Sequence, residues 1–279
     1  MNILIFSHVP TYPLDQGNRQ RVFEICSFFK SKGAILHFAY YPREWGGKYD
    51  LNTMTEMNKQ WDFFEIIPPH QPLKYRPKKD FHRLDEWWDK NIEDYIKLKL
   101  TGVDFDACIV NYTFFSKFLE FLPKDVIKIL DTHDRIGGRK ELLLKHGIES
   151  NFFHTSNEQE KIGLDRADII LGISEEETKH YRSFSDKCCF WLGHSFNNRL
   201  IRTKKQKNKK VKFGFIGSKN QVNSENMIQF ITYIKQSYSN ITDDFEMIVA
   251  GECCEDLSIF TDILFSCFFK CPEIILSYS

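Results

Sequence analysis

The sequence predicts an α/β protein with a parallel, doubly wound sheet, followed by a second domain of the same class. The first observation is a series of short, continuous apolar runs, which are typical of strands buried on both faces. The second is that helical patterns fill the intervals between these runs, as crossover helices do in a parallel sheet. The third is a new glycine-containing strand pattern near residue 211, where the strand–helix alternation starts again.

The apolar runs and the patterns between them define the elements expected in the first domain. Strands are expected at 3–7, 35–40, 63–67, 107–111, 126–131, 168–173 and 188–192, and helices at 18–32, 82–100, 113–122, 139–146, 155–167 and 175–183. Ser174 with Glu177, and Thr155 with Glu158, have the spacing of capping boxes at two helix starts. Gly33 follows the first helix as a C-cap signal.

Two stretches break this rhythm. The segment 42–82 is rich in Pro, Trp and Lys and is expected to be an exposed excursion. The stretch 202–212 holds seven Lys or Arg residues, which suit a contact with anionic lipid head groups or a nucleic acid. A solvated linker is the alternative, and it is favoured because the run is short and lies where the composition changes. We expect an N-terminal domain at 1–200, a basic linker at 201–210 and a second domain at 211–279.

The second domain is expected to contain a strand at 211–217, a helix at 223–237, a strand at 245–251 and a helical tail at 256–266. The chain ends at Ser279, which is too early for a complete domain of this class. The sequence therefore predicts one complete α/β domain and the first part of another.

Composition argues against several classes of function. Lys and Arg together number 38, as do Asp and Glu, so the net charge is zero and gives no support to nucleic-acid binding. No apolar run approaches the ~20 residues of a membrane span. The eight Cys residues form no Cys-x-x-Cys pair and no signal peptide precedes them, a pattern typical of free thiols in a cytoplasmic protein.

Polar residues follow four of the expected strands, and open parallel sheets bind ligands beyond the carboxyl ends of their strands. After the first strand, Gly17 opens a helix whose backbone N–H groups and dipole favour an anion or hydroxyl oxygens. Arg19 and Arg21 add positive charge there. The turn has no Gly-x-Gly-x-x-Gly pattern, so no dinucleotide site is predicted, and an ordinary strand–helix loop remains the alternative.

The strand expected at 126–131 runs into Asp131-Thr132-His133-Asp134. A histidine between two carboxylates at such a strand end is suited to acid–base or hydrogen-bonding work. His-x-Asp alone supplies too few ligands for a metal site. A loop histidine that is only stabilised by its Asp neighbours remains the alternative.

An acidic triplet, Glu175-Glu176-Glu177, follows the strand expected at 168–173. The positive end of the next helix is a sufficient structural reason for these carboxylates. A contact with substrate is the secondary interpretation.

The fourth strand end carries Gly217, Ser218 and Lys219. Backbone N–H groups and an ammonium at a helix start form a cradle suited to a diphosphate. The spacing does not fit a P-loop, which needs Gly-Lys-Ser/Thr after a second glycine. A strand–helix turn capped by Asn223 is the alternative.

Taken together and in order, four stretches resemble the GT-B glycosyltransferases of the glycosyltransferase 4 type, from bacterial surface-polysaccharide synthesis. They are 15–22 (Asp-Gln-Gly-Asn-Arg-Gln-Arg-Val), 131–134 (Asp-Thr-His-Asp), 166–177 (Arg-Ala-Asp-Ile-Ile-Leu-Gly-Ile-Ser-Glu-Glu-Glu) and 214–218 (Gly-Phe-Ile-Gly-Ser). The resemblance implies a GT-B fold of two Rossmann-like domains, the second incomplete. It implies a glycosyltransferase that moves a sugar from a nucleotide-sugar donor to a glycan or lipid-linked acceptor. The place implied is the cytoplasm, with a peripheral contact at the inner face of the membrane left open.

The resemblance also implies roles for residues of the first domain. His133 matches the histidine that faces the cleft near the donor sugar, and it is the candidate catalytic residue. Gly17 matches the glycine loop near the transferred sugar and the acceptor. Asn18, Arg21 and Asp134 are further candidates for acceptor or sugar binding.

On the donor side, Gly217, Ser218 and Lys219 fall where the family contacts the donor diphosphate. The family more often has Arg at the position of Lys219, with a Lys slightly later. The resemblance implies a nucleotide sugar as substrate, with no cofactor and no metal. In such enzymes positive side chains and helix dipoles stabilise the leaving diphosphate.

The chain departs from the family where the second domain would continue. The family's second domain has a pair of glutamates, with seven residues between them, that binds the donor ribose and sugar, and residues 211–279 of this chain contain no such pair. A truncated transferase with low or no activity is therefore expected. The alternative is a non-catalytic sugar- or nucleotide-binding module that has lost the donor half-site. A sugar-nucleotide epimerase of GT-B fold is a third interpretation, and it requires the same complete second domain.

Overall fold

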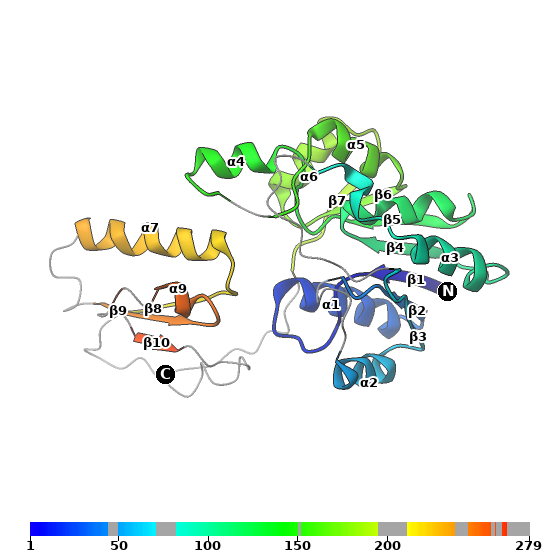
Figure 1. Cartoon of the computed structure of the whole chain (residues 1–279), viewed down its shortest axis with the longest axis horizontal. Helices are drawn as coiled ribbons and strands as arrows, with labels where there is room; N and C mark the ends of the chain where they lie inside the picture. The colour runs from blue at the N-terminus through cyan, green and yellow to red at the C-terminus, as the bar shows by residue number, and fades with distance from the viewer. Residues whose placement is uncertain are drawn as a thin grey trace. The chain divides into compact units, whose positions relative to one another are not determined.

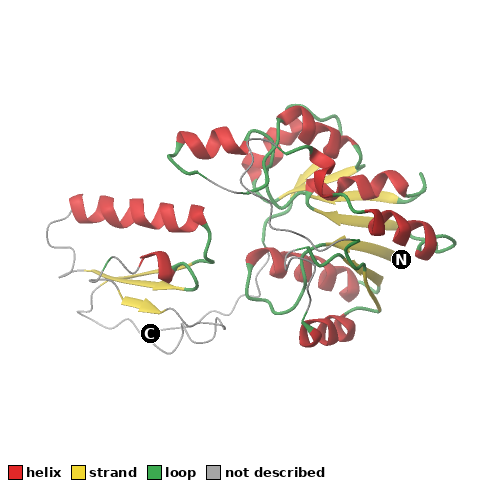
Figure 2. Cartoon of the chain, viewed as in Figure 1, coloured by secondary structure: helices red, strands yellow, loops and turns green. Residues whose placement is uncertain are grey.

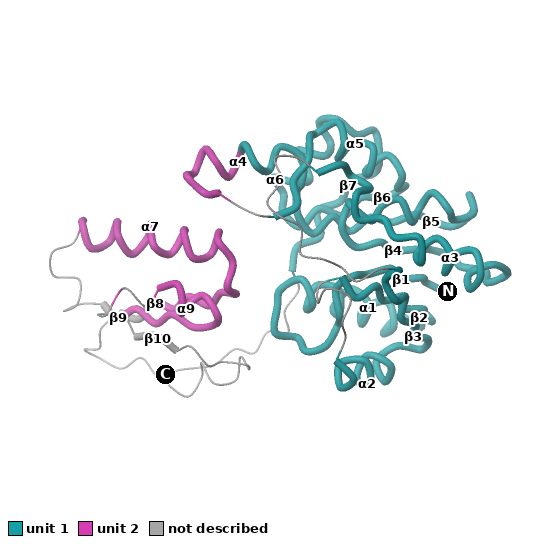
Figure 3. Tube along the Cα trace, in the orientation of Figure 1, with its two compact units in different colours: residues 1–141, 151–196 teal, residues 142–150, 197–279 magenta. Residues whose placement is uncertain are grey.

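The computed structural model (Figure 1) describes residues 1–43, 50–70, 82–149, 152–194, 211–237, 245–257, 260 and 264–266. Contacts along the chain define two compact units, 1–141 with 151–196 and 142–150 with 197–279, which Figure 3 colours separately. The second unit includes 142–150, a stretch that the sequence analysis assigned to the first domain. The linker expected at 201–210 lies outside the described residues.

The first unit is built on a parallel sheet of seven strands in the order β3-β2-β1-β4-β5-β6-β7. The strands are β1 (Asn2–Ser7), β2 (Ile35–Tyr40), β3 (Phe63–Ile66), β4 (Ala107–Asn111), β5 (Ile127–Asp131), β6 (Ile169–Gly172) and β7 (Cys188–Trp191). The chain proceeds from β1 to β3 on one side and then returns to place β4 on the other side of β1. The carboxyl ends of β1 and β4 therefore flank the switch point at which doubly wound sheets bind ligands.

Alternate residues of β1 face two separate cores, which explains why the strand is apolar almost throughout. Ile3 and Ile5 pack with residues of α1 and α2, whereas Leu4 and Phe6 pack with residues of η1, α3, η2, α5 and α6. Figure 2 shows the helices on both sides of this sheet. The helices of the unit are α1 (Gly17–Ser31), α2 (Leu51–Gln60), η1 (Leu84–Trp87), α3 (Lys90–Lys99), η2 (Thr113–Phe121), α4 (Arg139–Lys145, shared with the second unit), α5 (Asn157–Asp165) and α6 (Glu175–Arg182).

The second unit has a smaller parallel sheet in the order β10-β9-β8. Its described elements are β8 (Val211–Ile216), α7 (Gln221–Ser237), β9 (Phe245–Ala250), α9 (Cys254–Leu257) and β10 (Leu264–Ser266). Met227 and Ile231 of α7 form its core with Val249, Cys253 and Leu257. Only one helix of more than two turns covers this sheet in the described part of the chain, so its core is much smaller than those of the first unit.

Every strand expected from the sequence is present, with ends that differ by no more than a residue or so. Two helical predictions are wrong. The helical tail expected at 256–266 contains β10, and the single helix expected at 82–100 is split into η1 and α3. The split occurs at Asp89, whose carboxylate accepts the N–H of Asn91 at 2.8 Å and so starts α3 anew.

The prediction of an exposed excursion at 42–82 is also wrong in part, because it missed α2; β3, which lies in the same segment, was expected at 63–67. Asp50 caps α2 by accepting the N–H of Thr53 at 2.8 Å. Met54 and Met57 then bury one face of the helix against the sheet. The sequence contains a signal for this helix, because the cap residue Asp50 is followed by Met54 and Met57, three positions apart. The Pro-rich composition of the segment led the sequence analysis to overlook it.

The predicted helix caps are partly confirmed. Gly33 has a φ of 82°, and the hydroxyl of Ser174 accepts the N–H of Glu177 at 3.1 Å. The cap of α5 is Ser156, which accepts the N–H of Gln159, and not Thr155. The cap of α7 is Asn220, whose side chain accepts the N–H of Asn223 at 2.9 Å, and not Asn223 itself. In both errors a neighbouring side chain is better placed to reach the free N–H groups.

Candidate functional site

Polar side chains of the first unit gather where its central strands end. His8 directly follows β1, Asn111 ends β4 and Asp131 ends β5, while Arg21 comes from α1 and His133 from the loop after β5. All five residues are buried. Because they lie at the switch point of the sheet, this cluster is the candidate functional site of the first unit.

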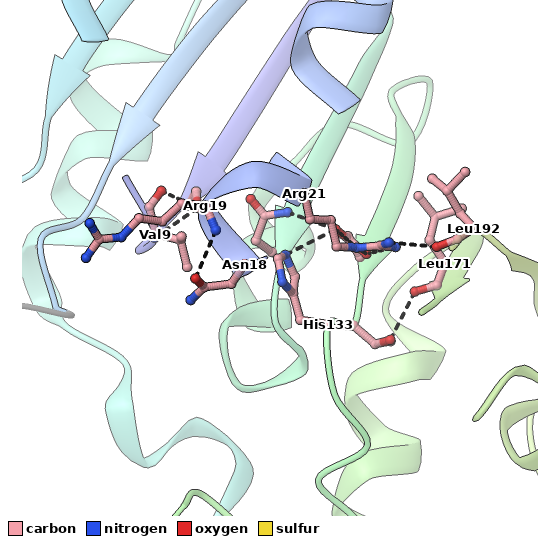
Figure 4. Close-up of polar contacts among 11 residues, drawn as sticks. Val9, Asn18, Arg19, Arg21, His133, Leu171 and Leu192 are labelled. Atoms are coloured by element: carbon pink, nitrogen blue, oxygen red, sulfur yellow. Dashed lines mark hydrogen bonds and ion pairs between the residues drawn. The ribbon is translucent and has the colours of Figure 1, made fainter. Parts of the chain in front are cut away.

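Arg21 and Asp131 are joined across 110 positions of the chain by a buried ion pair, drawn in Figure 4. The Nε of Arg21 donates to both carboxylate oxygens at 3.0 Å, and its Nη2 donates to Oδ1 at 2.7 Å. Its Nη1 donates to the backbone carbonyl of Leu192, just after β7, at 2.6 Å. One guanidinium thus fixes α1, the end of β5 and the end of β7 to one another.

His133 lies against this ion pair in a constrained backbone conformation. Its φ is 60°, in the left-handed region that few residues other than Gly occupy. The ring stacks on Tyr112, with centroids 4.3 Å apart and planes 10° from parallel. Its Nε2 lies 3.1 Å from Oδ2 of Asp131, a close electrostatic contact. The loop after β5 therefore presents the ring in one orientation.

Burial and nearby charges lower the pKa values of three residues in or next to the cluster. Burial raises the pKa of Asp131, but His133 and Arg21 more than offset burial and hold that pKa at about 2. Burial lowers the pKa of His8 well below its usual range, and the nearby charges of His133 and Arg43 lower it further. His194 shows the same direction, since burial and the charges of Arg21 and His133 lower its pKa. The site therefore combines the ionised carboxylate of Asp131 with the neutral imidazoles of His8 and His194 near pH 7.

Several polar atoms of this cluster lack a hydrogen-bond partner within the described part of the chain. They are Nδ1 of His8, Oδ1 of Asn111 and Oγ1 of Thr113. Buried polar groups are almost always paired in folded proteins, so each such atom needs a water or a ligand to satisfy it. Their concentration behind two adjacent strand ends marks the switch point as the place for a polar ligand.

The sequence analysis missed His8 and Tyr112. His8 contacts Tyr112 edge to face, with centroids 4.7 Å apart, so one tyrosine ring touches both His8 and His133. The signal for His8 was its position directly after the first strand. Tyr112 has the same signal, since it directly follows β4, but its stacking on His133 depends on a φ of 70° and on β4 lying beside β5.

The other predicted residues of the first domain are close to members of this cluster in the chain, since Gly17 and Asn18 begin α1 and Asp134 follows His133. Gly17 is exposed, and a Cβ there would meet no atom within 4 Å, so the helix start is open on that side. The Oδ1 of Asn18 accepts the N–H of Arg19 at 2.9 Å. Asp134 is about half exposed and lies 3.6 Å from Arg139. A contact of Gly17, Asn18 or Asp134 with an acceptor or sugar stays a prediction.

In the second unit, Gly217 and Gly251 bring the ends of β8 and β9 into close contact. The N–H of Gly217 donates to Ala250 at 3.1 Å, and its carbonyl accepts the N–H of Cys253 at 3.2 Å. Gly251 has a φ of 94°, and a Cβ on it would overlap the carbonyl oxygen of Gly217. The sequence analysis missed Gly251, although a glycine directly after an apolar strand was a readable signal.

Lys219 lies beside these glycines and is exposed. Its ammonium forms an ion pair with Glu255, which raises its pKa, and Asp256 and Glu252 act in the same direction. Ser218 is tied to the start of α7, since its carbonyl accepts from the side chain of Asn223 at 3.1 Å. A diphosphate at this turn would have to compete with Glu255 for Lys219.

Two further site classes were searched for over the described residues. No group of three or more His, Cys, Asp or Glu side chains is placed there to hold a metal ion. None of the described helices combines the length and hydropathy of a transmembrane span.

Comparisons with known proteins identify the fold. No protein-family model matches the sequence, and no curated protein matches it significantly. The structure matches sucrose-phosphate synthase from Thermosynechococcus elongatus at a TM-score of 0.62 and 12% identity, over 96% of this chain and 71% of that one. It matches the N-terminal domain of Candida albicans trehalose-6-phosphate phosphatase at a TM-score of 0.61 and 12% identity, over 99% and 74%.

A third match is Arabidopsis thaliana UGT89C1 complexed with UDP, at a TM-score of 0.50 and 11% identity, over 99% of this chain and 71% of that one. At such low identities the matches show the fold and not the activity. The chain has the α/β, Rossmann-like parallel-sheet architecture of the GT-B glycosyltransferase structures, as the sequence predicted.

Proposed function

We propose that the chain is a nucleotide-sugar glycosyltransferase of the glycosyltransferase 4 type, acting on a glycan or lipid-linked acceptor. The GT-B fold and the match to a UDP-bound structure support the nucleotide-sugar part. The four sequence stretches that resemble the family support the type and a role in polysaccharide biosynthesis for the cell envelope. A cytoplasmic location, at the inner face of the membrane, follows from the same resemblance.

The observation that carries the proposal is the group of unpartnered buried polar atoms at the switch point of the first sheet. His8, Asn111 and Thr113 each hold one such atom, and hydroxyl groups of a sugar can donate to or accept from all three. We assign His133 the contact with the transferred sugar. We assign Arg21 a positioning role, because its described bonds go to Asp131 and Leu192.

In this proposal the bond between the sugar anomeric carbon and the donor phosphate oxygen breaks, and a bond to an acceptor hydroxyl oxygen forms. The acceptor hydroxyl gives its proton to a phosphate oxygen of the departing nucleoside diphosphate, which leaves with the bonding electrons. We assign the diphosphate to the turn of Gly217, Ser218 and Lys219. There the N–H groups at the start of α7 and one ammonium would stabilise the charge that develops on the leaving group.

A second candidate is a non-catalytic binding module that uses the first unit alone. The observation in its favour is that the whole polar cluster, from His8 to His133, lies within that unit. Such a module would bind a saccharide without a nucleotide. The two candidates differ in whether the turn at 217–219 is needed.

Turnover of a panel of nucleotide sugars by the purified chain tests the proposal, with release of nucleoside diphosphate as the readout. The expected result is release that depends on a glycan acceptor. The variant His133→Asn should lower kcat by about 10²-fold or more, because it removes a group that acts on the transferred sugar. Saccharide binding with neither nucleotide binding nor diphosphate release would support the second candidate and overturn the first.

A further inference from the structure

The loop that carries His133 is held by two carboxylates from different helices. The Oε1 of Glu177, on α6, accepts the N–H of Arg135 at 3.0 Å. The Oε1 of Glu160, on α5, accepts the N–H of Ile136 at 2.8 Å. Two consecutive peptide groups, beginning two residues after His133, are thus each bound by a glutamate. Neither bond was foreseen from the sequence, in which Glu177 was only a helix-start residue.

The carboxylates of both glutamates are shielded from water, and this loss of hydration costs free energy. Glu160 is fully buried, and Glu177 is largely shielded from solvent. In the described structure the second oxygen, Oε2, of each has no hydrogen-bond partner. Burial raises the pKa of Glu177, and the charges of Asp134 and Glu160 raise it further, against the N–H of Arg135. The Oε2 of Glu160 lies 3.8 Å from Nε2 of His180. A buried carboxylate whose second oxygen accepts no hydrogen bond costs free energy.

The loop backbone is shaped to pass close to these carboxylates. A Cβ on Gly137 would lie 2.5 Å from Oε2 of Glu160, so a side chain there would have to displace this carboxylate. Gly137 also forms an isolated bridge with Thr155, next to the cap of α5. The loop between β5 and α4 is therefore packed directly on the start of α5.

Hydrogen bonds hold the backbone on both sides of His133. On its N-terminal side the hydroxyl of Thr132 donates to the carbonyl of Leu171 at 3.0 Å, and on its C-terminal side stand the two glutamates. A histidine at a φ of 60° keeps this conformation only when its surroundings determine it. These hydrogen bonds on both sides of His133 hold its backbone at this φ.

We infer that Glu160 and Glu177 are positioning residues that hold the ring of His133 against Tyr112 and beside Asp131. They act through the N–H groups of Ile136 and Arg135, and neither touches the candidate ligand atoms. The inference rests on the proposed function only for the role of His133, which is to contact the transferred sugar. The contact itself is read from the free protein, so its test does not depend on nucleotide binding or turnover.

The test is the NMR position of the His133 ring protons in protein labelled with ¹³C-histidine. Stacking on Tyr112 shifts these protons upfield, and His133→Asn assigns the signal by removing it. Tyr112→Leu defines the position without the ring. Glu177→Gln and Glu160→Gln keep an oxygen that accepts the N–H, whereas Glu177→Ala and Glu160→Leu do not. Glu176→Ala, an exposed change on the same helix turn, is the matched control.

The expected result is that both Gln variants and the control keep the upfield signal, while Glu177→Ala and Glu160→Leu lose at least half of the Tyr112-dependent shift. Glu177 is not fully buried, so its pair of variants decides the matter if the Glu160 variants do not fold. An unchanged His133 signal in Glu177→Ala would overturn the inference. Loss of the signal in Glu177→Gln would overturn it too, because the amide still offers the acceptor that the inference requires.

Discussion

The guanidinium of Arg21 and the carboxylate of Asp131 form a three-bond ion pair in which both side chains are almost fully removed from solvent. A buried pair of this kind adds little stability compared with apolar packing, but loss of one partner leaves an uncompensated charge. Since His133 and Asn111 also contact this carboxylate, the pair organises the candidate site.

The first prediction concerns the ion pair itself. Arg21→Met should lower the free energy of unfolding by about 3–5 kcal/mol, because it leaves Asp131 buried and unpaired. Urea unfolding measures the change. Lys161→Ala breaks the exposed pair with Asp165 and serves as the control, with an expected change of ~0.5 kcal/mol or less. A loss in Arg21→Met no larger than in the control would show that the pair is not a buried unit.

The second prediction is an acid-dependent loss of stability. The pKa of Asp131 is about 2 in the folded chain and about 3.9 when unfolded, so between these values only the unfolded chain binds the proton. Stability should fall by roughly 2–3 kcal/mol as the pH falls from about 5 to about 1. The double variant Arg21→Met/Asp131→Met should lack this contribution. A double variant with the full acid loss of the natural chain would assign the effect to other carboxylates.

The third prediction concerns His8 and lies in a higher pH window. Its lowered pKa means that the unfolded chain binds a proton below about pH 6.5 while the folded chain does not. Stability should therefore fall as the pH drops from about 6.5 to about 5, by at most about 1.4 kcal/mol per pH unit for this one proton. His8→Phe, which suits the surrounding aromatic rings, should reduce that slope. An equal slope in both proteins would contradict the assignment.

The fourth prediction concerns the close approach of the strand ends in the second unit. Gly251→Ala should destabilise this unit by about 1–3 kcal/mol, because its φ of 94° disfavours a side chain and a Cβ would meet the carbonyl of Gly217. Gly214→Ala is the matched control, since a Cβ there meets nothing within 4 Å. Thermal unfolding of the two variants is compared. Similar melting temperatures would mean that the turn relaxes without cost.

The sequence predicted the strands well because their signal is local. Each strand of the sheets is a short apolar run, and the ends of β2 and β4 match the prediction residue for residue. The start of α5 shows the limit of the same reasoning. Thr155 and Ser156 are adjacent potential caps, and only the three-dimensional course of the chain decides that Ser156 reaches the free N–H.

The candidate site could be predicted only in part, because its partners are distant in the chain. The motif at 131–134 correctly placed His133 at a strand end. The pairing of Arg21 with Asp131 spans 110 positions and needs the order of the sheet to be known. The Arg-Ala-Asp stretch at 166–168, which supported the family resemblance, forms contacts that stabilise the fold of this chain. Arg166 pairs with Asp85 and Glu120, and Asp168 accepts the N–H of Lys128.

The central claim, that the second unit binds the diphosphate of a nucleotide sugar, is tested most directly by calorimetric titration of the 279-residue chain with UDP. We predict saturable binding that Lys219→Ala weakens about tenfold or more, while Lys161→Ala in the first unit leaves it unchanged. Absence of saturable binding at millimolar UDP, or equal affinity in Lys219→Ala and the natural chain, would contradict the claim.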